Sequence, residues 1–136
     1  MAAKKRANNT SSNYMITMSY DVFEKDENFL GKLRSNFFGT EFILYDTGVN
    51  PKDSDNSQDW RCQYAGVEYE TNFFGLKGPK KMKTYLAGLT ETETTFELKP
   101  SKKDPSIIEL GQKKTNKRII TFVNKQPKWN ESKNYN

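Results

Sequence analysis

The sequence contains no histidine and only one cysteine, Cys62. An intrachain disulfide is therefore excluded, and the usual zinc ligand sets cannot be assembled. The lack of histidine also removes the commonest general base and the Ser-His and Cys-His pairs that activate nucleophiles. We therefore expect neither a metal site nor a cofactor, and we do not expect an enzyme.

Apolar residues are also scarce, since they make up 34% of the chain and the mean hydropathy is -0.93. No run approaches the roughly 18 consecutive apolar residues that span a bilayer, and the N-terminus has no apolar segment typical of a signal peptide. A chain of 136 residues has the length of one ordinary domain. We therefore expect a single soluble, intracellular domain with a thinly supplied core.

Basic residues outnumber acidic ones, which gives a net charge of +5 and a pI of about 9.2. This charge suits an anionic partner such as phosphate-rich lipid or nucleic acid, although an ordinary solvated surface explains it equally well. Residues 1–12 combine Lys4, Lys5 and Arg6 with a small polar stretch. This composition predicts a mobile tail, and a nuclear address or a lipid contact are the weaker alternatives.

Short runs with the two-residue period of β-strands follow the tail. Tyr14, Ile16 and Met18 occupy alternate positions after Asn13. Further strands are predicted at residues 41–45, 66–71, 82–87, 94–98, 107–110 and 118–123. Turn-forming Gly, Pro and Asn residues separate these runs, which predicts an antiparallel sheet or barrel. The only helix that we expect is a short one at residues 21–30, and residues 53–59 read as an exposed loop.

One segment resembles a catalytic motif: residues 42–48 (FILYDTG) have the apolar-apolar-Asp-Thr-Gly form of an aspartic protease. Such an enzyme shares a proton between two carboxylates, so this chain would have to dimerise around Asp46. Val49 replaces the small residue that usually follows the glycine, and no clear second element lies downstream. An Asp-Thr-Gly turn at a strand end explains the motif without catalysis.

Basic side chains are placed at strand ends and loops. Lys32 and Arg34 flank Leu33, so both project from one face if residues 31–38 are extended. Arg61 opens the strand that follows the polar loop. A further basic cluster lies in a Gly-Pro turn and consists of Lys77, Lys80 and Lys81. A solvated strand face is the ordinary explanation, but an Arg fork with Lys point charges is also what polyphosphate recognition requires.

Aromatic residues are plentiful and are candidates for stacking on single-stranded bases. They include Phe37, Phe38, Trp60, Phe73, Phe74 and Trp129. Packing in the core or in loops is the commoner use of such residues. The sequence has no RNP-type run of Lys or Arg followed by Gly-Phe-x-Phe, so nucleic acid is the less favoured partner.

Four segments resemble, in the same order, motifs of the C-terminal domain of tubby proteins. Residues 30–42 (LGKLRSNFFGTEF) resemble the family's Gly-Lys-Leu-Arg-Ser-Asn strand, and residues 45–51 (YDTGVNP) are similar to the Tyr-Asp-Asn-Gly-Val-Asn-Pro that follows it. Residues 69–82 (YETNFFGLKGPKKM) look like its Tyr-Glu-Thr-Asn and Gly-Phe-Lys-Gly-Pro-Arg-Lys-Met. Residues 124–130 (NKQPKWN) look like its Asn-Lys-x-Pro-x-Trp-Asn.

The resemblance implies a closed β-barrel threaded by an apolar helix, with phosphatidylinositol 4,5-bisphosphate bound on the outer surface. The family's headgroup ligands are an Asn in a Ser-Asn-Tyr strand, the Lys and Arg of Gly-Lys-Leu-Arg-Ser-Asn, and an Arg shortly before Tyr-Glu-Thr-Asn. Motif by motif, these positions fall on Asn13, Lys32, Arg34 and Arg61. The basic cluster at residues 77–81 is a candidate accessory patch.

The family domain is longer than this chain, and the chain departs from it at both ends. We therefore expect residues 13–136 to form an incomplete tubby-like antiparallel barrel without the first strands and the central helix. The chain is then a fragment, or a second chain supplies the missing parts, or the chain is only marginally folded.

The expected function is that of a phosphoinositide-binding adaptor or trafficking module with a protein cargo. It would act in the cytoplasm at the inner face of the plasma membrane, with the cilium or nucleus as further locations. A nuclear, nucleic-acid-binding regulator is the alternative.

Overall fold

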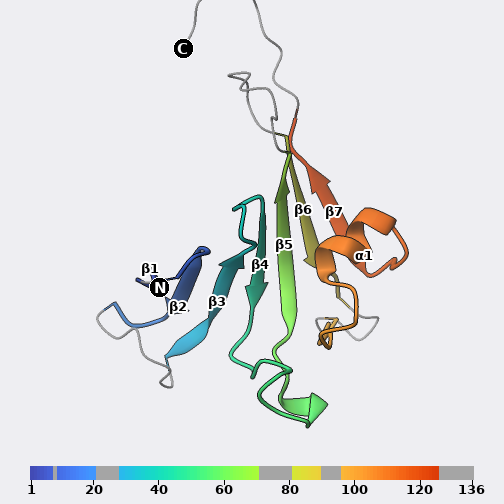
Figure 1. The fold of residues 1–136 in the computed structure, drawn as a ribbon. Helices are drawn as coiled ribbons and strands as arrows, with labels where there is room; N and C mark the ends of the chain where they lie inside the picture. The colour runs from blue at the N-terminus through green and yellow to red at the C-terminus, as the bar shows by residue number, and fades with distance from the viewer. Residues whose placement is uncertain (8, 21–27, 71–80, 90–95, 126–136) are drawn as a thin grey trace, which may run out of the picture.

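The computed structural model describes residues 1–7, 9–20, 28–70, 81–89 and 96–125, which form an antiparallel sheet with a short helix packed against it (Figure 1). The elements are β1 (Ala2–Lys5), β2 (Asn13–Thr17), β3 (Phe29–Ser35), β4 (Glu41–Tyr45), η1 (Ser57–Asp59), β5 (Gln63–Tyr69), β6 (Met82–Ala87), α1 (Ile107–Lys113) and β7 (Ile119–Val123). Each strand pairs with its neighbour in the chain, in the order β1 to β7. The predicted mainly β, antiparallel fold is confirmed. Over the described residues the sheet is open rather than closed into a barrel.

The turn between β3 and β4 shows how local chemistry sets the register of the sheet. The Asn36 Oδ1 accepts hydrogen bonds from the backbone N–H of Thr40 at 2.9 Å and of Glu41 at 3.3 Å. Gly39 has a φ of 67°, a left-handed conformation that glycine adopts without strain. The resulting register pairs Arg34 with Ile43.

The segment at residues 107–110, predicted as a strand, is the first part of helix α1, so this prediction is wrong. Ser106 caps the helix: its hydroxyl accepts from the backbone N–H of Glu109 at 3.3 Å, and the Glu109 carboxylate accepts from the backbone N–H of Ser106 at 2.7 Å. This reciprocal capping box satisfies donors that a helix start leaves unpaired. The Ile107 N–H donates to the Gln63 Oε1 at 2.8 Å, which ties the helix to β5.

The core lies between α1 and strands β5 to β7. Tyr85, Ile107 and Ile108 are almost completely buried, and Ile119 joins them. A Cβ atom at Gly66 would lie 2.5 Å from the Ile108 Cγ1, so the absence of a side chain there lets the helix approach the sheet. The Tyr85 hydroxyl donates to the Glu68 carboxylate at 2.8 Å, and burial is the main cause that raises the pKa of this phenol.

Directly paired residues of an antiparallel sheet share a face, so the register defines two faces. The helix face carries Tyr85 and α1 on one half, and Arg34 and Ile43 on the other. On the opposite face, paired apolar residues form one row across five strands. The row consists of Leu33, Leu44, Ala65, Leu86 and Ile120.

Two predictions near the N-terminus are corrected in part. Residues 2–5 form β1 and pair with β2, so the expectation of a mobile tail is wrong for them. The helix predicted at residues 21–30 falls mainly on residues 21–27, which lie outside the described residues. Its last two residues, Phe29 and Leu30, belong to β3.

The strand predicted at residues 94–98 begins outside the described residues, and Phe96 to Leu98 are not part of a named strand. They still contact the sheet through hydrogen bonds from Phe96 N to Gly88 O and from Gln63 N to Leu98 O. No described helix has the length and apolar character of a membrane span.

Candidate anion-binding site

Three of the predicted ligands lie on neighbouring strands of the helix face. Asn13 in β2 pairs directly with Arg34 in β3. Lys32 lies two residues before Arg34, which places it on the same face and roughly 7 Å along the strand. The alternation predicted from the sequence is therefore confirmed for Lys32 and Arg34, and the structure adds Asn13 beside Arg34.

Asn13 is only 3% exposed, and its side-chain oxygen has no hydrogen-bond partner among the described residues. A buried acceptor left without a partner costs about 1–3 kcal/mol.

Arg61 reaches the site through a folded loop. The loop returns because Val49 and Trp60 form an isolated parallel bridge, in which Arg61 N donates to Val49 O at 2.9 Å. The backbone of Arg61 passes so close to Gly48 that a Cβ atom there would lie 2.5 Å from the Arg61 Cα. Glycine is therefore required for this approach.

Asp46 holds the same loop in place. Its Oδ1 accepts hydrogen bonds from the backbone N–H groups of Gly48 and Cys62, both at 2.9 Å. The Asp-Thr-Gly motif thus joins the end of β4 to the residue that follows Arg61. This arrangement gives Asp46 a structural role, as the alternative to catalysis predicts.

The guanidinium of Arg61 lies over the ring of Tyr45, with its Cζ 4.2 Å from the ring centroid. This cation–π contact orients the side chain toward β3 and β4. Burial lowers the pKa of the Arg61 guanidinium from its usual value, and the charge of Arg34 acts in the same direction. Arginine nevertheless stays protonated at neutral pH, so two like charges lie close enough to interact here. An anion between them would relieve their repulsion.

Two adjacent hollows open beside these cations, and Arg34, Tyr45 and Arg61 line both. The first, which we call the strand hollow, has a volume of about 360 Å³ and is also lined by Ser11, Ser35, Asn36, Glu41 and Ile43. The second, the loop hollow, has a volume of about 330 Å³ and is also lined by Gln63 and by residues of the segments 50–52 and 100–106. Both volumes are in the range of small-ligand sites.

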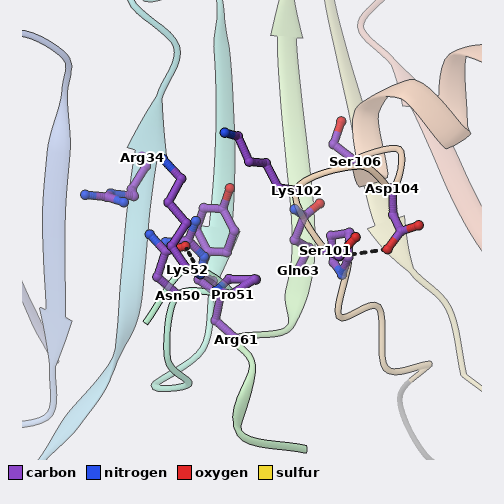
Figure 2. A pocket seen from close by; sticks show the side chains of 12 residues that line it. Arg34, Asn50, Pro51, Lys52, Arg61, Gln63, Ser101, Lys102, Asp104 and Ser106 are labelled. Atoms are coloured by element: carbon purple, nitrogen blue, oxygen red, sulfur yellow. Dashed lines mark hydrogen bonds between the residues drawn. The ribbon is translucent and has the colours of Figure 1, made fainter. Parts of the chain in front are cut away.

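The loop hollow contains two cations that the sequence did not point to, Lys52 and Lys102. In Figure 2, Lys102 extends from the 100–106 segment toward the side on which Arg34 and Lys52 lie. The carboxylate of Asp104, which also lines this hollow, accepts from the backbone N–H of Ser101 at 2.9 Å. Four basic side chains thus surround a space that has one carboxylate, and that carboxylate is already engaged.

The structure divides the predicted set of ligands. Arg34 and Arg61 share both hollows, whereas Asn13 and Lys32 line neither. The Lys32 ammonium lies 5.7 Å from the centroid of the Phe29 ring. The compact part of the site is therefore the arginine pair, with Asn13 and Lys32 beside it on the same face.

The accessory patch is placed only in part. Lys77 and Lys80 lie outside the described residues. Lys81 forms an ion pair with Glu70 at 3.4 Å, next to the end of β5 that is farthest from Arg61. Lys81 therefore does not contribute to either hollow.

Lys52 and Lys102 were missed because they come from loops that are distant in sequence from Arg34. The only feature of the sequence that marked Lys102 as a candidate was the run of basic residues between Pro100 and Pro105. It gave no indication of which strand it would approach. Tyr45 lies at the end of a predicted strand and begins the YDTGVNP motif, but neither feature indicated its contact with Arg61.

The chain is therefore a mainly β protein, an open antiparallel sheet that carries a group of basic side chains on one face. The family model described as the Tub family matches residues 1–136. The chain is 35% identical over 135 residues to Tubby-related protein 3 of Mus musculus, a match that covers 96% of this chain and 29% of that protein. The chain belongs to the Tub family, which confirms the resemblance found in the sequence.

Other relatives give the same result. Tubby-related protein 1 of Homo sapiens is 34% identical over 134 residues, which is 96% of this chain and 25% of that protein. Protein king tubby 1 of Aedes aegypti is 34% identical over 132 residues, which is 96% of this chain and 31% of that protein. The chain thus spans less than a third of the length of these relatives.

Proposed function

We propose that this chain carries the phosphoinositide-binding surface of a tubby-type adaptor that associates with membranes. The observation that supports the proposal is the convergence of Arg34, from β3, and Arg61, from the loop before β5, on two adjacent hollows. A guanidinium pair binds phosphate oxygens in a bidentate manner. Asn13 and Lys32, on the same face, supply a neutral group and a further charge.

Charge alone is too weak for this function. Basic residues near an anionic membrane contribute about 1 kcal/mol each, so Lys32, Arg34 and Arg61 together give about 3 kcal/mol. That energy corresponds to a dissociation constant of several millimolar. Specific geometry must supply the rest, and the stacking of Arg61 on Tyr45 and the pairing of Asn13 with Arg34 are the features that provide it.

The proposal is tested by sedimentation with vesicles that contain phosphatidylinositol 4,5-bisphosphate. Replacing Lys32→Ala and Arg34→Ala together should abolish sedimentation, because the double variant loses the fork and the adjacent charge. A matched control, Lys113→Ala with Lys117→Ala, removes the same charge from exposed positions in and after α1 and should bind like the unchanged chain. Undiminished binding by the first variant would remove the basis of the site assignment.

Nucleic acid binding is separated by an oligonucleotide mobility shift at the same salt concentration. Binding through the arginine pair should follow headgroup phosphates and be insensitive to bases. A role at the inner face of the plasma membrane, with a protein cargo and a ciliary or nuclear destination, follows from this proposal as its biological setting.

A further inference from the structure

The tip of the β3–β4 hairpin exposes two large aromatic side chains. Phe37 is 73% exposed and Phe38 is 82% exposed. Their rings contact each other edge to face, with centroids 5.5 Å apart and an interplanar angle of 85°. Adjacent exposed Phe residues on a soluble surface are unfavourable unless something covers them, so this tip indicates an interaction site.

The tip has a defined conformation. In addition to its two accepted hydrogen bonds, Asn36 donates from Nδ2 to the Thr40 hydroxyl at 2.9 Å, and its backbone carbonyl accepts from Gly39 N at 3.2 Å. These hydrogen bonds fix the backbone of the turn that carries both rings before any partner is bound. Such preorganisation reduces the entropy lost on binding.

The same hairpin forms the rim of the strand hollow. Asn36, which immediately precedes Phe37, lines that hollow together with Ser35, Arg34 and Arg61. Glu41 is the carboxylate on this rim. In Figure 1 the turn lies at one end of β3 and β4, where it connects the two strands. An apolar tip is thus continuous with a cationic hollow.

We propose that Phe37 and Phe38 insert into the boundary between headgroups and acyl chains of an anionic membrane while Arg34 and Arg61 hold a headgroup beside them. This inference rests on the proposed function and adds a second, apolar contact to it. Aromatic rings next to basic side chains are the combination that binds membrane interfaces, where the apolar and anionic layers are only a few ångströms apart. The pairing of the tip with the cations favours a bilayer over a protein partner.

The test compares two probes: phosphatidylcholine vesicles with phosphatidylinositol 4,5-bisphosphate, and soluble inositol trisphosphate, which has no acyl chains. Phe37→Ser with Phe38→Ser should weaken vesicle binding by about tenfold or more and leave inositol trisphosphate binding unchanged. The matched control is Met18→Ser with Tyr20→Ser. These side chains are 58% and 83% exposed and follow the end of β2 that is far from the hairpin. The control should bind both probes like the unchanged chain.

A second measurement locates the side chain directly. A Phe38→Trp variant should show fluorescence, above the signal of the two native Trp residues, that brominated acyl chains quench. Vesicle binding that is unchanged in the double Ser variant, or an equal loss of both probes, would overturn the insertion. Failure of the unchanged chain to bind inositol trisphosphate would instead refute the proposed function.

Discussion

The two halves of the helix face differ in what covers them. Helix α1 packs on strands β5 to β7 and covers them, and Tyr85, Ile107 and Ile108 are at most 1% exposed. Over β3 and β4 no helix packs among the described residues, and Arg34 and Arg61 border open hollows. The comparison shows a division of roles, in which one half supplies packing energy and the other leaves cations accessible to a ligand.

The largest effect is expected for stability, from a substitution in the half of the sheet that α1 covers. Ile108→Ala removes a side chain that contacts the surface of Gly66 and should lower the free energy of unfolding by about 2–5 kcal/mol. Ile120→Ala, at a side chain that is 49% exposed on the opposite face, should cost less than about 1 kcal/mol. Urea denaturation measures both variants. Equal costs would show that α1 does not form the core.

An intermediate effect should come from the loop that positions Arg61. Asp46→Ala removes the acceptor of two backbone hydrogen bonds and should lower stability by about 1–3 kcal/mol and weaken vesicle binding. Asp46→Asn retains a side-chain oxygen and should have a smaller effect on both.

The same pair of variants tests the protease alternative. A catalytic Asp46 predicts pepstatin-sensitive cleavage that Asp46→Asn abolishes as completely as Asp46→Ala does. A graded effect on lipid binding, without cleavage of a peptide substrate, agrees with the structural role.

The smallest effect should come from the loop hollow. Lys102→Ala removes one of the two loop lysines that border the hollow, and should reduce vesicle binding about fivefold, or ~1 kcal/mol. The loss should shrink as salt is raised, because such charges are screened. Sedimentation at two salt concentrations checks this. A loss as large as that of Lys32→Ala with Arg34→Ala would move the centre of the site to the loops.

Helix α1 shows why the strand predicted from the local sequence at residues 107–110 was wrong. Ser106 and Glu109 have the spacing of a capping box, but the pair Ile107-Ile108 also suits a strand, and seven residues are too few for a helix to be stable alone. The hydrogen bond from Ile107 N to Gln63 and the packing of Ile108 on Gly66 decide the outcome. Both contacts are distant in sequence.

The candidate site also depends on contacts between residues that are distant in sequence. Lys32 and Arg34 could be assigned to one face because alternation follows from backbone geometry. The nearness of Arg61 to Arg34 depends on the bridge between Val49 and Trp60 and on the space at Gly48. No periodicity encodes such a return of the loop.

By itself, the sequence determined the family, the antiparallel strands and the shared face of Lys32 and Arg34. These follow from motifs in fixed order and from a two-residue period, which are properties of neighbouring residues. Only the tertiary structure decided that α1 seals one half of the sheet and that Arg61, Lys52 and Lys102 meet Arg34 around the open half. The physical reason is that these contacts join segments far apart in the chain, and their packing is settled only when the whole sheet forms.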